Sequence, residues 1–185
     1  MLKRLDEAGW ITYTSGQGAR LTEEGLAEAR RVVRRHRLVE LFLTRALGLD
    51  WSEVDAVAEA LEHAISPRLE QAIADYLGEP LEDPHGHPIP SQDGEMVERN
   101  LHSLNNLKVG QSALIREAQD DSPERLRQWQ SQGLVPGAVV CVMAFEKMDN
   151  LFTVKVGEST VAVSGESMAG LHGELISEER ASYES

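Results

Sequence analysis

The hydrophobic pattern at the start of the chain changes from helical to alternating within about twenty residues. Leu2 and Leu5 are spaced as on one face of a helix that ends at Gly9. Residues 10–13 and 20–21 are β-type and flank a glycine-rich turn. This order is typical of the recognition helix and wing of a winged helix-turn-helix, and an ordinary β-hairpin explains it equally well. On the first interpretation the printed sequence starts inside the recognition helix, so we expect an N-terminally truncated form.

Residues 22–78 carry helical periodicity in three segments. Thr22 is a candidate N-cap, and the first segment is expected to run to about Gly48 with a broad apolar face. The second begins at Ser52, and Ser66-Pro67 ends it and starts the third, since serine is favoured at the N-cap and proline directly after it. The apolar stripes of the two short helices predict a dimerisation surface. An intrachain helical hairpin explains them comparably well.

The C-terminal half loses the helical period. Prolines keep residues 79–92 extended, and His85 and His87 in this loop are interpreted as turn or packing residues rather than as metal ligands. Short β-like runs follow, with one helix expected over 122–132. The pattern predicts an α+β protein that ends in a small SH3-like β-barrel. The expected units are a helix end and β-wing (1–21), a helical domain (22–92), a linker (93–105), the barrel (106–177) and a disordered tail (178–185).

Composition and charge limit the classes of protein that fit this pattern. The formal net charge is −13, which argues against a nucleic-acid partner. Residues 1–50, however, contain nine basic and seven acidic side chains and are +2, which leaves −15 for the rest and permits DNA binding at one end. No apolar run approaches the roughly 20 residues of a membrane span, and the N-terminus lacks a signal-peptide core. The single cysteine, Cys141, excludes an internal disulfide, so we expect a cytoplasmic protein.

A candidate metal site comes from the spacing of acidic and histidine residues on two predicted helices. Glu59, Glu62 and His63 lie three and four positions apart, so a helix presents them on one face. His36 and Glu40 are also four positions apart. Imidazole and carboxylate ligands suit a divalent first-row metal, and oxygen donors favour the harder ions. A solvated acidic face explains the first group alone, whereas two helices that each offer histidine and carboxylate favour a metal site.

Three motifs together resemble the metal-dependent transcriptional repressors of the diphtheria-toxin-repressor type, which include iron- and manganese-responsive regulators. The motifs are Arg35 to Glu40, Glu59 to His63 and the loop Pro84 to Pro90. Residues 107–175 are similar to the SH3-like module of that family, which is related to the FeoA-like accessory domains of ferrous-iron transport. The resemblance implies a winged helix that reads operator DNA, a homodimer formed by the next helices, and metal bound between the two parts.

The resemblance also implies which side chains hold the metal. The positions that match ligands are His36, Glu59, Glu62 and His63, with Glu40 beside them at an ancillary site and Asp55 where many iron regulators have a further histidine. The iron branch typically has cysteine where this chain has Glu59. A carboxylate there is similar to the manganese branch and shifts the preference toward harder ions. The family's ligands from the C-terminal domain align near Ser122 and Arg125, with Asp120, Asp121 and Glu124 as possible replacements.

The implied function is that of a regulator rather than an enzyme. Its cofactor would be Mn(II) or Fe(II). Its partners would be a second copy of the chain and, for the full-length form, operator DNA, with no membrane and no small-molecule substrate. The residues expected to contact DNA are Lys3, Arg4, Ser15, Gln17 and Arg20. One alternative is a metal-sensing dimerisation module that does not bind DNA itself. The other is a carboxylate-histidine metallohydrolase, which needs a general base and an open coordination position, and no residue in the sequence stands out as that base.

Overall fold

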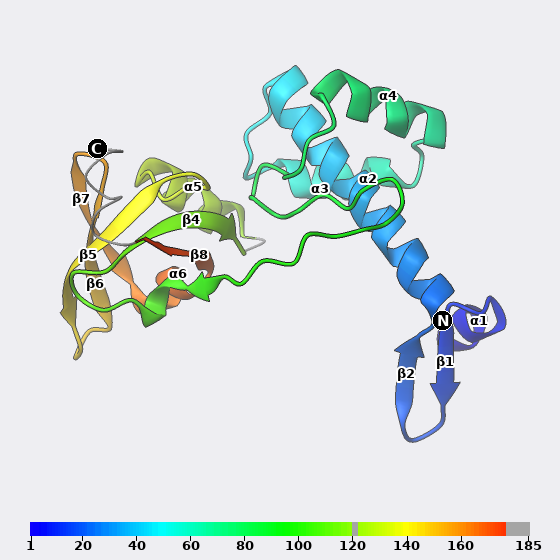
Figure 1. Cartoon of the computed structure of the whole chain (residues 1–185), viewed down its shortest axis with the longest axis horizontal. Helices are drawn as coiled ribbons and strands as arrows, with labels where there is room; N and C mark the ends of the chain where they lie inside the picture. The colour runs from blue at the N-terminus through cyan, green and yellow to red at the C-terminus, as the bar shows by residue number, and fades with distance from the viewer. Residues whose placement is uncertain (120–121, 177–185) are drawn as a thin grey trace.

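The computed structural model describes residues 1–119 and 122–176. Figure 1 shows a long helix, α2 (Glu23–Leu47), with a small β-hairpin at its start and two shorter helices beside its second half. An extended segment then leads to a curved antiparallel sheet at the other end of the molecule. Helices followed by an antiparallel sheet make this an α+β protein, as the sequence predicted.

The N-terminal hairpin is fastened to the first turn of α2. It consists of α1 (Leu2–Glu7), β1 (Ile11–Thr14) and β2 (Gly18–Leu21), with Ile11 paired to Leu21. The backbone N–H of Thr22 donates to the carbonyl of Trp10 at 3.0 Å, and its hydroxyl donates to the carbonyl of Gly9 at 2.6 Å. A Cβ at Gly25 would lie 1.8 Å from the same Trp10 oxygen. Only glycine allows this approach, so helix and hairpin meet backbone to backbone.

The helical part is built as the capping signals predicted. The Thr22 hydroxyl accepts from the N–H of Gly25 to cap α2, and α2 ends at Gly48 in the left-handed conformation. The other two helices are α3 (Val54–Glu62) and α4 (Pro67–Leu77), and the Ser66 hydroxyl caps α4. Two small buried clusters join α2 to these helices. They hold α3 and α4 along the half of α2 that is remote from the hairpin.

The C-terminal part is a six-stranded antiparallel sheet in the order β3-β8-β4-β5-β6-β7. Its strands are β3 (His102–Ser103), β4 (Ser112–Ala118), β5 (Val139–Glu146), β6 (Leu151–Val156), β7 (Ser159–Ser164) and β8 (Leu171–Ile176). A 3₁₀ turn, η1 (Leu104–Asn106), and the helices α5 (Pro123–Ser131) and α6 (Gly165–Ala169) complete it. The main hydrophobic core lies here, around Trp129.

Several boundaries differ from the sequence-based expectation. The second helix starts at Val54 rather than Ser52 and ends at Glu62. β3 and the first two residues of η1 lie inside the range predicted as a linker, and β3 pairs with β8 as part of the sheet. The run Lys108 to Gly110, expected to be β-like, is a turn. The predicted tail (178–185) lies outside the described residues. Among the described residues, no helix is long and apolar enough to cross a membrane.

Candidate metal centre

Helix α2 supplies the first two side chains of the site from one face. His36 and Glu40 are one turn apart, and His36 Nε2 lies 3.6 Å from Glu40 Oε1. Asp55, in the first turn of α3, places Oδ1 3.3 Å from the same nitrogen. The donor atoms of these three residues all lie within 4.8 Å of one another. Glu40 is buried and Asp55 is more than half exposed, so the group opens toward solvent on the α3 side.

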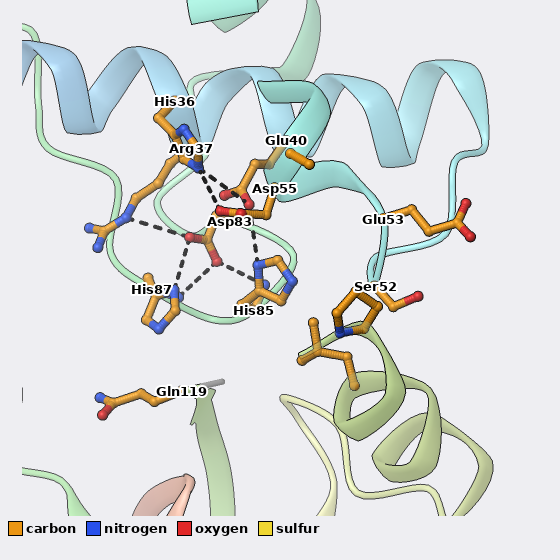
Figure 2. Close-up of a pocket in the computed structure, with 13 residues that line it drawn as sticks. His36, Arg37, Glu40, Ser52, Glu53, Asp55, Asp83, His85, His87 and Gln119 are labelled. Carbon is orange, nitrogen blue, oxygen red and sulfur yellow. Dashed lines mark hydrogen bonds and ion pairs between the residues drawn. The ribbon is translucent and has the colours of Figure 1, made fainter. Parts of the chain in front are cut away.

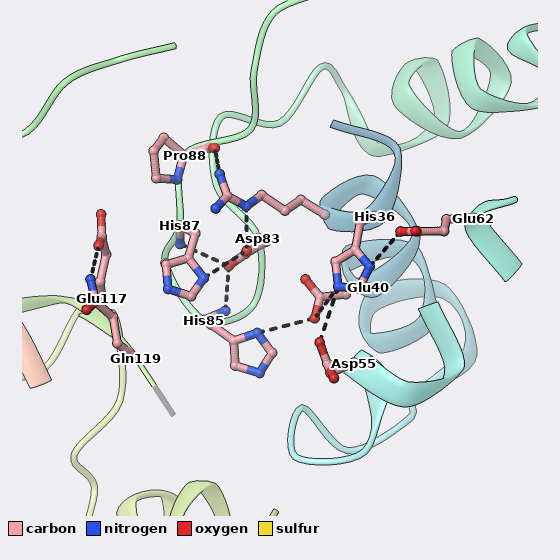
Figure 3. Close-up of polar contacts among 12 residues, drawn as sticks. His36, Glu40, Asp55, Glu62, Asp83, His85, His87, Pro88, Glu117 and Gln119 are labelled. Carbon is pink, nitrogen blue, oxygen red and sulfur yellow. Dashed lines mark hydrogen bonds and ion pairs between the residues drawn. The ribbon is translucent and has the colours of Figure 1, made fainter. Parts of the chain in front are cut away.

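The second nitrogen of the His36 ring also faces a carboxylate. Nδ1 lies 2.8 Å from Glu62 Oε2 at the end of α3, so acidic groups flank both edges of the imidazole (Figure 3). Hydrogen bonding and charge from Glu40, and then from Glu62, raise the pKa of His36 from 6.5 to about 9 against the opposing effect of burial. The ring is therefore protonated at neutral pH in the absence of metal. Its positive charge stabilises the surrounding carboxylates.

A second group of possible ligands lies on the loop after α4. Asp83, His85 and His87 place their donor atoms within 4.8 Å of one another. Asp83 Oδ1 accepts the backbone N–H groups of His85 and His87 at 2.8 and 2.9 Å, and Oδ2 lies 3.2 Å from His87 Nδ1. Burial alone would raise the pKa of Asp83, but the hydrogen bond and charge of His87, with the charge of His85, lower it below its usual value. Asp83 is therefore ionised, and its carboxylate holds the loop in place through these hydrogen bonds.

Glu40 connects the two groups. Its Oε1, already 3.6 Å from His36, is 3.5 Å from Nδ1 of His85, so one buried carboxylate lies between two imidazoles. Both groups line a single cavity of about 450 Å³ between the helical part and the start of α5 (Figure 2). Arg37 borders it, with its guanidinium 3.5 Å from Asp83 and hydrogen-bonded to the Pro88 carbonyl. The cavity is thus lined by nitrogen and oxygen donors from three separate segments.

The spacing of these donors fits a first-row divalent ion. Metal–ligand bonds of about 2.1 Å put neighbouring ligand atoms ~3 Å apart and opposite ones ~4.2 Å apart. The separations of 3.3 and 3.6 Å around His36 fall within that range. A ligand histidine is usually oriented by a hydrogen bond at its other nitrogen, and Glu62 is in place to accept one from Nδ1. Nitrogen and carboxylate donors without a thiolate suit Mn(II) and Fe(II).

The stretch Glu59 to His63 is arranged differently from the prediction. Glu62 points inward, with a side chain only 9% exposed, whereas the His63 side chain is 76% exposed and lies 3.6 Å from Glu62. Glu59 is exposed. Within residues 1–119 and 122–176, neither Glu59 nor His63 belongs to a group whose donor atoms meet within 4.8 Å. A ligand role for these two residues stays a prediction.

The other predicted site residues lie on the surface. Lys3 and Arg4 on α1 and Ser15, Gln17 and Arg20 on the hairpin are all exposed. Of the residues proposed to replace the C-terminal ligands, Asp120 and Asp121 lie outside the described residues. Glu124 is exposed, and its carboxylate lies 3.1 Å from the Ser122 hydroxyl and 3.6 Å from Arg127.

Asp83 was not recognised from the sequence as a site residue, and the two loop histidines were interpreted as packing residues. His85 is indeed buried, but it shares a group of donor atoms with Asp83 and His87. The available signal was the alternation Asp83-Pro-His85-Gly-His87, which puts three metal-binding side chains at every second position of one tight loop.

Two family models match most of the chain. Residues 22–91 match the iron dependent repressor, metal binding and dimerisation domain, and residues 102–171 match the FeoA domain. Both confirm the domain types expected from the sequence, the helical metal-binding domain and the FeoA-like SH3 domain. The described β-sheet is therefore the FeoA-type module.

Individual proteins give the same relationship. A manganese-dependent transcriptional repressor in complex with manganese is 31% identical, with a TM-score of 0.87 over 95% of this chain and 82% of that one. Over 66 residues (36% of this chain), the chain is 38% identical to an HTH-type transcriptional regulator of Methanocaldococcus jannaschii. Over 65 residues (35%), it is 38% identical to the iron-dependent repressor IdeR of Mycobacterium bovis. The matches span 53% and 28% of these two relatives, so the chain covers about half of their length or less.

Proposed function

Because the chain belongs to the diphtheria-toxin-repressor family of metal-dependent transcriptional regulators, we propose that it is a DNA-binding regulator that responds to Mn(II) or Fe(II). In this proposal it represses metal-homeostasis genes and acts in the cytoplasm. It is a regulator and not an enzyme. The observation that carries the proposal is the group of His36, Glu40 and Asp55, whose nitrogen and two carboxylate oxygens converge from α2 and α3.

The proposed centre holds the metal through Nε2 of His36 and one oxygen each of Glu40 and Asp55. A bound divalent ion would neutralise the carboxylates and link α2 to α3 through its coordination bonds. His36 then donates Nδ1–H to Glu62, which keeps the ring aimed at the cavity. The loop residues Asp83, His85 and His87 complete the donor set from the other side of Glu40. Metal occupancy therefore favours one arrangement of helices over others, which is how a ligand shifts a conformational equilibrium.

DNA binding is proposed for the hairpin end of the molecule. Basic and polar side chains are exposed there, and the Gly25 contact fixes the hairpin to the helix that also carries His36 and Glu40. The metal-binding half and the DNA-binding end thus share one rigid element. The first 50 residues carry a net charge of +2 and the rest −15, so the hairpin end is the part of the chain that phosphate repels least.

We expect Mn(II) to increase the affinity of the chain for duplex DNA that contains the promoter of a metal-uptake gene. Fluorescence anisotropy across a salt series measures it. Arg20→Gln should lower the affinity in Mn(II) and reduce the slope of log K against log salt by about 0.9, as for one lost phosphate contact. Arg45→Gln, an exposed arginine at the opposite end of α2, is the matched control and should change neither. Equal binding with and without Mn(II) would contradict the metal response, and no binding in either condition would favour the metal-sensing module that does not bind DNA itself.

A homodimer is proposed through the outer face of α3 and α4. Four large apolar side chains on these helices are 37 to 68% exposed: Val57, Leu61, Leu69 and Tyr76. Val57 and Leu61 are four residues apart and Leu69 and Tyr76 are seven apart, so each pair lies along one face of its helix. An exposed apolar patch of this kind marks an interaction surface.

Leu69→Glu should convert the dimer to a monomer, because it buries a charge in the proposed interface. Sedimentation velocity at tens of micromolar protein measures the state. Leu175→Glu, at a similarly exposed leucine on β8, is the control and should leave the dimer intact. A wild-type chain that sediments as a monomer with and without Mn(II) would contradict the proposal.

A further inference from the structure

Trp51 belongs to the helical part by sequence and to the C-terminal domain by packing. It lies in the turn between α2 and α3, yet it is only 9% exposed and forms part of the buried cluster that contains Leu126 and Trp129 of α5. Its indole N–H donates to Oε1 of Gln130, also on α5, at 3.2 Å. The helical part therefore inserts one aromatic side chain into the core of the other domain.

The opposite side of Trp51 holds the metal-binding loop. The indole stacks on the imidazole of His85, with ring centroids 5.3 Å apart and planes inclined by 27°. Nε2 of His85 lies 2.9 Å from the backbone carbonyl oxygen of Trp51. A carbonyl oxygen only accepts hydrogen bonds, so Nε2 carries the proton in this contact. In the neutral form of the ring the lone pair is then on Nδ1, which lies 3.5 Å from Glu40 Oε1 beside the cavity.

Strand β4 fixes the same loop from the other side. The N–H of Ala118 donates to the carbonyl of His85 at 2.9 Å. A Cβ at Gly86 would lie 1.8 Å from the carbonyl oxygen of Arg116, at the irregular point of β4 where its pairing to β8 shifts register. Arg99 adds a hydrogen bond to the Gly86 carbonyl at 2.9 Å. His85 is thus held between Trp51 and β4, and both supports depend on the C-terminal domain.

We infer that Trp51 is a positioning residue for the metal centre: it sets the tautomer and orientation of His85 and, through Gln130, makes both depend on docking of the C-terminal domain. The inference rests on the proposed function, in which His85 is a metal ligand. Partners that bond the second nitrogen of a ligand histidine commonly change metal affinity by ~10–100-fold when removed. The FeoA-type domain therefore acts on metal affinity through a ring stack and a carbonyl, in addition to any ligand of its own.

The experiment uses the full chain and Mn(II) as the probe. Trp51→Leu removes the stack and the indole N–H and should weaken Mn(II) binding in calorimetry by about tenfold. Trp51→Phe keeps an aromatic ring for the stack and should stay within about threefold of wild type, and both variants keep the backbone carbonyl of residue 51. Trp10→Phe, at an exposed tryptophan near the hairpin, is the control and should bind as wild type does. His85→Ala sets the size of the effect when the ligand itself is lost.

Two-bond ¹H–¹⁵N spectra of the metal-free protein report the tautomer of His85. A general loss of stability would not change this tautomer in the folded protein. In wild type the neutral His85 ring should be the Nε2–H tautomer. In Trp51→Leu the ring stack that holds the imidazole against the carbonyl is lost, so the two tautomers should mix. A wild-type ring protonated on Nδ1 overturns the inference without any variant. Wild-type affinity in Trp51→Leu, with weakened binding in His85→Ala, also overturns it and leaves the proposed metal site standing. Wild-type affinity in His85→Ala would instead remove His85 from the proposed site.

Discussion

Glu40→Gln should weaken Mn(II) binding by about a hundredfold or more, because one carboxylate serves both groups of donors. Its Oε1 lies 3.6 Å from His36 and 3.5 Å from His85, and the side chain is 4% exposed. The substitution keeps the shape of the residue and removes the charge between two imidazoles. At a fixed excess of metal, a hundredfold loss removes ~2.7 kcal/mol of metal-linked stability. For a chain of this size the metal-induced rise in Tm should therefore shrink by ~5–10 °C.

Calorimetry and thermal unfolding with and without Mn(II) measure this change. Glu53→Gln is the matched control, because Glu53 lines the same cavity but turns its carboxylate to Arg127, 3.5 Å away. His63→Ala separates the two arrangements of ligands considered above. Binding lost in Glu40→Gln and retained in His63→Ala places the centre at His36, Glu40 and Asp55. The reverse result would place it on the exposed stretch Glu59 to His63 and contradict the geometry proposed here.

The metal-free protein should lose stability as the pH rises from 6.5 to 9. The pKa of His36 is about 9 in the folded chain against 6.5 for an ordinary histidine, so the native state binds the proton more tightly. Its contribution is complete below pH 6.5 and is lost as the pH passes through 9. Since the side chain is 23% exposed, we expect ~2 kcal/mol rather than the full value of the shift.

Chemical denaturation of the metal-free chain at several pH values tests this expectation. His36→Gln should lose most of the decline, and His102→Gln, at an exposed histidine on β3, should keep it. Metal needs the lone pair that the proton occupies, so Mn(II) affinity should rise with pH over the same interval, with release of up to one proton from His36. Stability that is flat between pH 6.5 and 9 in wild type would show that His36 is not paired with Glu40 and Glu62 in solution.

Local signals were sufficient for the helices and for half of the candidate centre. Thr22, Gly48 and Ser66-Pro67 act within one turn, and α2 begins and ends, and α4 begins, where these residues predicted. His36 and Glu40 lie on one uninterrupted helix, so their spacing alone placed them together. Residues that come from other segments could not be placed in this way. Asp55 was identified only by its position in a family motif, and Asp83 was not identified at all.

The outward placement of Glu59 and His63 has a geometric cause. The inward face of α3 is Val54, Ala58 and Glu62, spaced by four residues. A neighbouring position is turned by about 100°, so Glu59 and His63, each one residue after an inward position, face solvent. The sequence argument grouped three residues correctly around a helix but could not say which of them faces α2.

The length of α2 decides what kind of signal can pass between the metal centre and the hairpin. Thirteen residues separate Glu23 from His36, which is ~20 Å of helix. The Debye length at physiological salt is about 8 Å, so the charge of a bound ion is screened before it reaches the hairpin. A tilt of α2, in contrast, is not weakened by distance. A tilt of ~5° about His36 displaces the start of the helix by ~2 Å over that span. The close contact between Gly25 and Trp10 would pass that displacement to the hairpin. A bound ion would therefore act on the hairpin by changing the tilt of α2 and not by its charge.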